Sequence, residues 1–174
     1  MNVFRKEPRI TSAYLREEAK AYTERWALGR NPRYFDYSSL GGDCTNFASQ
    51  VLYAGGALMN YATELGWYYQ TPNQKSPSWT GVNFLYQFLT GHSGPGPVAV
   101  ECNPKELEIA DLIQLSFTGD GVFHHTLVIV DLVKNNHPEQ IRIATHSPNL
   151  LNVKLSEAYS WAAIRYLHIL GNQG

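Results

Sequence analysis

The chain has 174 residues, of which 44% are apolar and 17% charged, so we expect one folded domain spanning residues 1–174 with a hydrophobic core. The formal net charge is −1, whereas nucleic-acid-binding proteins usually carry an excess of basic residues, so binding to nucleic acid is not expected. Two cysteines are too few for a disulfide-rich scaffold, although a single bridge between Cys44 and Cys102 stays open.

The sequence carries no signal for membrane insertion. No apolar run approaches the roughly 20 residues of a transmembrane helix, and residues 1–9 lack the apolar core of a signal peptide. The chain as given is therefore expected to be cytoplasmic. A domain cut from a longer secreted precursor would show the same features, so that alternative stays open.

The first half of the chain has the periodicity of helices. Residues 12–28 are expected to form an amphipathic helix that Thr11 or Ser12 caps. A second helix is expected over residues 44–54 and a third over residues 79–89, because apolar residues recur there at three- and four-residue spacing.

After a glycine- and proline-rich connection at residues 91–97, the periodicity becomes that of strands. Four strands are expected, at residues 112–117, 126–133, 140–145 and 163–170. The short connections between them favour antiparallel neighbours. Helices followed by a meander of strands predict an α+β fold, with N-terminal helices packed on a mainly antiparallel sheet.

Cys44 is the first candidate for a catalytic residue. It follows Gly41, Gly42 and Asp43, so a turn leads directly into the second expected helix, with Asp43 as its N-cap. The positive end of a helix dipole favours thiolate over thiol, and a thiolate is a nucleophile. The same helix terminus can donate N–H groups to an oxyanion. The alternative is that Cys44 is a small buried apolar residue.

Two adjacent histidines, His124 and His125, are candidates for the general base because they stand at the start of the second expected strand. Strand alternation points them to opposite faces, so only one can meet Cys44, and alternation alone does not choose between them. A cysteine at a helix start and a histidine at a strand start indicate a cysteine hydrolase of papain-like architecture.

A catalytic histidine needs a third group that fixes its tautomer and orientation. His146 ends the third expected strand. If that strand pairs antiparallel with the second, His146 lies beside His125 and can orient its ring. Asn149, just beyond the strand, is the alternative third member.

Six segments in this order together resemble the putative amidase domain family found in many Gram-positive bacteria. They are residues 43–47 (DCTNF), 66–69 (GWYY), 78–82 (SWTGV), 110–114 (ADLIQ), 125–129 (HTLVI) and 144–147 (ATHS). The resemblance covers most of the chain. This family is grouped with the papain-like and NlpC/P60 cysteine peptidases.

The resemblance implies a papain-like (NlpC/P60-type) fold and a cysteine amidase or peptidase with no cofactor and no metal. It implies a peptide or amide substrate, with the stem peptide of peptidoglycan as one class. The family's histidine directly precedes an apolar strand, which matches His125. NlpC/P60 enzymes often use a histidine in the third role, which matches His146. In their pattern the aspartate before the cysteine, here Asp43, helps to hold a substrate amine.

Two other functions stay open. A metal-dependent hydrolase would draw its ligands from Asp120, His124, His125 and His146, although no compact motif such as HExxH is present and Cys44 would have no role. A non-catalytic binding module would keep only the cleft. Three aromatic side chains are candidates for the walls of that cleft: Trp67, Tyr68 and Trp79.

The sequence therefore favours a cysteine-dependent amide hydrolase. Cys44 attacks an amide carbonyl, His125 takes the thiol proton, and a thioester intermediate forms before water hydrolyses it. His146 orients His125 in this prediction.

Overall fold

The computed structural model describes residues 7–133 and 137–174. Residues 1–6, which belong to the stretch assessed for a signal peptide, lie outside the described residues. The α-helices are α1 (Arg16–Trp26), α2 (Cys44–Ala54), α3 (Pro77–Thr80), α4 (Val82–Gly91) and α5 (Leu155–Ala158). Two short 3-10 helices are η1 (Pro104–Glu106) and η2 (Pro138–Gln140).

The strands of the described residues form one seven-stranded sheet and one small hairpin. The sheet has the order β1-β9-β5-β6-β7-β8, with β4 also paired to β9, and all of its pairings are antiparallel. Its strands are β1 (Ile10–Ser12), β4 (Gly96–Glu101), β5 (Leu112–Ser116), β6 (His125–Asp131), β7 (Arg142–Thr145), β8 (Leu150–Lys154) and β9 (Ala163–Gln173). The hairpin pairs β2 (Tyr69–Thr71) with β3 (Gln74–Lys75).

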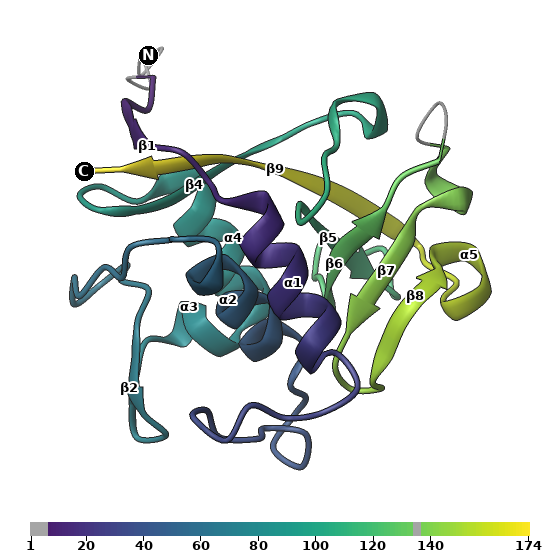
Figure 1. Ribbon diagram of the computed structural model, residues 1–174, viewed down its shortest axis with the longest axis horizontal. Helices are drawn as coiled ribbons and strands as arrows, with labels where there is room; N and C mark the ends of the chain where they lie inside the picture. Colours follow the sequence, from purple (N-terminus) through teal and green to yellow (C-terminus); the bar gives the residue numbers. More distant parts are fainter. Residues whose placement is uncertain (1–6, 134–136) are drawn as a thin grey trace.

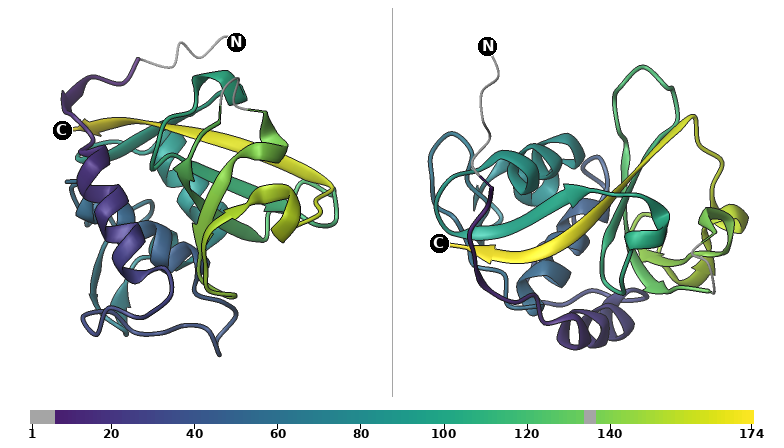
Figure 2. Two further views of the ribbon diagram at one scale, coloured as in Figure 1. Left: turned by 45° about the vertical axis from the view of Figure 1, so that its right-hand side comes forward. Right: turned by 90° about the horizontal axis from the view of Figure 1, so that it is seen from above.

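Helices α1 to α4 and strands β5 to β8 lie side by side (Figure 1). In Figure 1, α1 to α4 gather on one side of the molecule and β5 to β8 on the other, while β9 runs across both. The view from above in Figure 2 shows the same arrangement. The predicted α+β class, with N-terminal helices against a mainly antiparallel sheet, is confirmed.

Two hydrophobic clusters cover the two faces of the sheet. Strand β6 shows this most clearly, because Val128 and Val130 belong to the cluster shared with the helices. Leu127 and Ile129 belong to the second cluster, which lies among the strands and α5. Strand alternation therefore decides which side chains reach the helices and which do not.

Three expectations about the elements need correction. Helix α1 begins at Arg16, with no side-chain cap, because the proposed caps lie in or beside the edge strand β1. The third expected helix is divided into α3 and α4 at Gly81, which has an extended backbone. A Cβ at Gly81 would lie 2.8 Å from Cδ2 of Phe84 and 3.0 Å from the carbonyl oxygen of Pro77, so the close packing at this corner favours glycine. The stretch predicted as a flexible connection runs into strand β4 at Gly96.

Among the helices in residues 7–133 and 137–174, none has the length and apolar character needed to cross a membrane.

Candidate active site

Cys44 stands at the first position of α2, as the sequence predicts. Gly41 and Gly42 have φ values of +103° and +113°, which side chains with a Cβ rarely adopt. These two glycines turn the chain sharply into the helix. Helix α2 is buried over most of its length, and Cys44 itself is only 7% exposed.

The start of α2 meets the start of β6. The hydroxyl groups of Thr45 and Thr126 are hydrogen-bonded at 2.9 Å, which ties the residue after Cys44 to the residue after His125. The main-chain carbonyl of Thr126 also accepts a hydrogen bond from the Thr145 hydroxyl at 3.0 Å. The two proposed reacting residues, distant in the sequence, are thus brought to one junction of helix and sheet.

Burial dominates the electrostatics of Cys44. It raises the pKa of the thiol above its ordinary value, while interactions with the main chain of Thr126 and the hydroxyl of Thr45 oppose it in part. The sequence predicts a depressed pKa from the helix dipole. The structure contradicts that expectation, because the sulfur is removed from water.

His125 is 6% exposed, and its Nε2 lies 2.8 Å from the hydroxyl of Tyr159. The two rings meet edge to face with centroids 5.1 Å apart. Burial lowers the pKa of His125 to about 4, so the imidazole is neutral near neutral pH. Within the described residues no hydrogen bond joins the Cys44 sulfur to the His125 ring. The raised pKa of the thiol and the lowered pKa of the imidazole each favour the neutral form.

Tyr159 is a residue of this site that the sequence analysis missed. It follows α5 directly and is half-buried. Burial raises the pKa of its phenol to about 12, with a smaller contribution from nearby Cys44. No local pattern around Tyr159 marks it, since only the tertiary fold brings it to His125.

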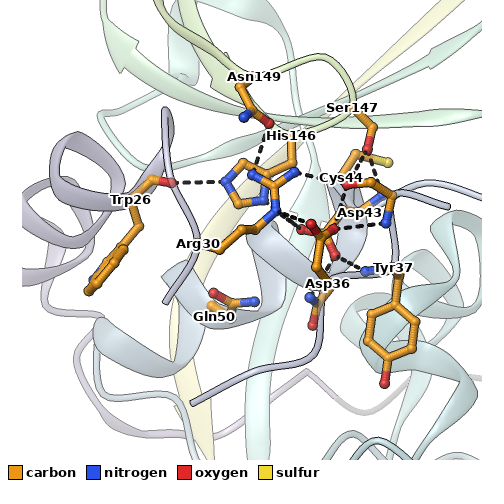
Figure 3. Close-up of polar contacts among 12 residues, drawn as sticks. Trp26, Arg30, Asp36, Tyr37, Asp43, Cys44, Gln50, His146, Ser147 and Asn149 are labelled. Atoms are coloured by element: carbon orange, nitrogen blue, oxygen red, sulfur yellow. Dashed lines mark hydrogen bonds and ion pairs between the residues drawn. The ribbon is translucent and has the colours of Figure 1, made fainter. Parts of the chain in front are cut away.

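His146 lies in a different network (Figure 3). Its Nδ1 lies 2.6 Å from Oδ2 of Asp43, and its Nε2 donates to the carbonyl oxygen of Trp26 at 2.9 Å. Its ring stacks on Phe47 with centroids 4.1 Å apart. Both ring nitrogens have partners other than His125. The expectation that His146 orients His125 does not fit this geometry.

Asp43 is the centre of that network. Its Oδ1 accepts hydrogen bonds from the Tyr37 N–H at 2.9 Å and the Asn46 side chain at 2.8 Å. Its Oδ2 also pairs with Nε of Arg30 at 3.3 Å. Asp43 occupies the N-cap position of α2, but its side chain makes no capping bond to the helix. The carboxylate is fully buried and has partners at both oxygens, so it is not open to a substrate amine.

Asn149, the alternative third member, also lies away from His125. Its side-chain oxygen accepts a hydrogen bond from Nη1 of Arg30 at 2.9 Å. Figure 3 shows Arg30 between Asn149 and the carboxylates of Asp36 and Asp43, with the Cys44 sulfur pointing away from this cluster.

Comparison with known proteins decides the family. The model of the putative amidase domain matches residues 13–169 of the chain. The chain belongs to this amidase domain family.

One relative is the uncharacterized protein YhbB of Bacillus subtilis (strain 168). The amidase domain is 37% identical to it over 127 residues, which are 72% of this chain and 40% of the relative. The chain therefore spans less than half of the length of that relative. No solved structure matches the chain.

The aromatic residues expected to wall a cleft lie mainly in the core of the amidase domain. Trp67 and Trp79 are fully buried, with ring centroids 4.7 Å apart. Their indole N–H groups donate to Ser49 and Asn46 of α2, each at 3.0 Å. Their full burial does not fit the expected cleft role, and both contact α2 through these hydrogen bonds. Only Tyr68 is partly exposed.

The residues of the metal alternative do not gather. His124 is exposed and stacks on Phe117, whereas His125 is buried at the junction with α2. In the part of the chain that the structure describes, no group of three or more His, Cys, Asp or Glu side chains is placed to hold a metal ion. Cys44 and Cys102 are both free, so the alternative of a disulfide between them is wrong.

Proposed function

We propose that this amidase domain is a cysteine-dependent amide hydrolase with a papain-like fold, in which Cys44 is the nucleophile and His125 the general base. The observation that carries the proposal is the junction of α2 and β6. The hydrogen bond of 2.9 Å between Thr45 and Thr126 holds the helix start that carries Cys44 against the strand start that carries His125.

The reaction begins from the neutral pair. The thiol proton of Cys44 passes to Nδ1 of His125, which has no hydrogen-bond partner among the described residues, while the sulfur attacks the amide carbonyl carbon. His125 then returns the proton to the leaving amine as the C–N bond breaks. The resulting thioester is hydrolysed by water, with His125 taking a proton from the water and returning it to the Cys44 sulfur.

The helix terminus supplies stabilisation of the oxyanion. The first N–H groups of a helix have no intrahelical acceptor, and Cys44 occupies the first helical position of α2. Its N–H is therefore a donor for the negative oxygen of the tetrahedral intermediate. No cofactor takes part in this scheme. A peptide amide is the substrate class, and the stem peptide of peptidoglycan is the specific candidate that the family resemblance suggests.

The test is hydrolysis of peptide amides and of purified peptidoglycan, with the released amines identified by mass spectrometry. Cys44→Ala and His125→Gln are expected to lower turnover at least about 10³-fold, because each removes a reacting group. Cys102→Ser and His124→Gln are matched controls and are expected to remain close to wild type. Full turnover by Cys44→Ala, or loss of turnover on chelation with recovery on adding zinc, would contradict the cysteine mechanism.

A further inference from the structure

We propose that Tyr159 is the positioning residue of His125, and that its hydroxyl selects the imidazole tautomer that leaves Nδ1 free to accept the Cys44 proton. This inference rests on the proposed cysteine mechanism and assigns its third member. It replaces His146 in that role.

The contact itself has the geometry that the role requires. The hydroxyl of Tyr159 lies 2.8 Å from Nε2 of His125, within normal hydrogen-bond distance. The edge-to-face packing of the two rings, at 5.1 Å, restricts rotation of the imidazole. The Phe117 ring lies against the Tyr159 ring, with the ring centroids 6.3 Å apart. His125 is therefore held at one nitrogen and along its ring edge.

The backbone that carries Tyr159 is itself anchored. The Leu155 N–H at the start of α5 donates to the carbonyl oxygen of Ile141 at 2.8 Å, and the Leu155 side chain is fully buried. The Ser156 hydroxyl donates to the carbonyl oxygen of Glu139 at 2.8 Å. The Tyr159 N–H then donates to the carbonyl oxygen of Leu155 at 3.0 Å. These contacts fix the backbone of Tyr159 relative to the strand β7 region.

The chemistry of a phenol suits a neutral catalytic pair. A hydroxyl oxygen can accept a hydrogen bond from Nε2–H, which leaves the lone pair of Nδ1 for the thiol proton. Tyr159 keeps its own proton throughout, since burial raises its pKa to about 12. When His125 becomes an imidazolium, the same oxygen still accepts from Nε2–H. No bond of Tyr159 forms or breaks during the reaction.

A neutral partner also agrees with the resting state of His125. A carboxylate in this position would favour the imidazolium and raise the pKa of the histidine. A phenol adds no negative charge, and the pKa of His125 is lowered to about 4 by burial. Tyr159 therefore differs chemically from His146, the third member that the sequence predicts, because its side chain is a neutral phenol.

The test compares Tyr159→Phe, which removes only the hydroxyl, with Tyr166→Phe. Tyr166 is a matched control, because burial also raises the pKa of its phenol to about 12. It belongs to β9, and in the described part of the chain no hydrogen bond or ring contact joins it to His125. Imidazole nitrogen NMR of histidine-labelled protein reports the tautomer of each histidine. We expect one neutral tautomer of His125, protonated at Nε2, in wild type and in Tyr166→Phe. In Tyr159→Phe we expect a mixture of both tautomers.

Turnover gives a second readout. Tyr159→Phe is expected to lower kcat about 10- to 100-fold with little change in KM, whereas Tyr166→Phe keeps the wild-type kcat. Wild-type kcat and an unchanged tautomer in Tyr159→Phe would overturn the inference. An Nδ1-protonated His125 in the wild-type protein would overturn it as well, and that measurement requires no variant to fold.

The two proposals can fail separately. If Cys44→Ala is inactive but Tyr159→Phe behaves as wild type, the cysteine mechanism stands and the role of Tyr159 is wrong. If Cys44→Ala keeps full turnover, the cysteine mechanism is wrong and the role of Tyr159 falls with it.

Discussion

At the scale of single residues, burial and the helix dipole act in opposite directions on Cys44. A helix N-terminus stabilises a nearby negative charge by about 0.3–1 kcal/mol, and by about 2 kcal/mol in favourable partly buried positions. Burial can shift the pKa of an ionisable group by about 3–5 units, with each unit worth about 1.4 kcal/mol. Since Cys44 is only 7% exposed, burial prevails and its pKa is raised.

This balance predicts how Cys44 reacts with iodoacetamide. Only the thiolate reacts, and the pKa of Cys44 lies above its ordinary value of 9.0. The alkylation rate near neutral pH is therefore expected to be lower than that of a free thiol, and to keep rising with pH beyond that value. Mass mapping at each pH separates Cys44 from Cys102, whose pKa is raised to about 11.

Urea-unfolded protein is the control for that experiment, because both thiols should then alkylate at similar rates. A rate of Cys44 that is already maximal near neutral pH would show a thiolate–imidazolium pair in the resting enzyme. It would contradict the neutral pair derived from burial.

At the scale of elements, the periodicity of apolar residues predicted one helix and four strands close to their observed positions. Helix α2 spans Cys44–Ala54, and strands β5, β6, β7 and β9 lie close to their predicted ranges. Strand β4 was missed because it begins with Gly96 and Pro97, which local rules assign to a turn. It pairs with β9 and also packs against α4, so tertiary contacts override the local preference.

The positions of the candidate residues were predicted in part for the same reason. Cys44 and His125 stand at element starts, which the sequence reveals. The role of His146 depended on strand register and face. Ala144 pairs with Val128, and both side chains lie in the cluster shared with the helices. His146 follows on that same face, whereas the ring of His125 contacts Tyr159, which packs against the second cluster. The antiparallel neighbour was predicted correctly, but the face was not.

The docking of α1 on the sheet leads to a second prediction. Nη1 of Arg16 donates to Asp111 and to the Ile109 carbonyl oxygen, each at 2.8 Å, and Nη2 donates to the Ile169 carbonyl oxygen at 2.7 Å. Asp111 is fully buried, so Arg16→Met removes its guanidinium partner and leaves it with His168 and two main-chain N–H groups. The free energy of unfolding in urea is expected to fall by about 3–5 kcal/mol.

The matched control for Arg16 is Arg25→Met on the same helix. Arg25 is exposed, so its replacement is expected to change the free energy of unfolding by about 0.5 kcal/mol or less. Equal unfolding midpoints for the two variants would show that Arg16 does not anchor α1.

At the scale of the whole molecule, the network around Asp43 connects parts that are distant in the sequence. Nε2 of His146 donates to the last residue of α1, Trp26, while Nδ1 contacts Asp43 at the start of α2. Arg30, in the loop between these helices, forms ion pairs with Asp36 and Asp43 and so connects that loop to the network. His146 itself directly follows β7, so the network ties the helical side to the sheet (Figure 3).

His146→Ala is therefore expected to act on stability. It leaves the buried carboxylate of Asp43 without one of its partners and opens space beside Phe47, so the free energy of unfolding should fall by about 3–5 kcal/mol. His146→Phe, which keeps a ring against Phe47 but loses both hydrogen bonds, should show most of the same loss. Urea unfolding of these variants, with the exposed His124→Ala as control, measures the effect.

The same variants separate His146 from Tyr159. At temperatures where His146→Phe stays folded, His125 should keep its single tautomer, because the contact with Tyr159 is intact. A fold as stable as wild type combined with a mixed tautomer of His125 would return His146 to the orienting role. Loss of stability with an unchanged tautomer would assign His146 to the assembly of helices and sheet.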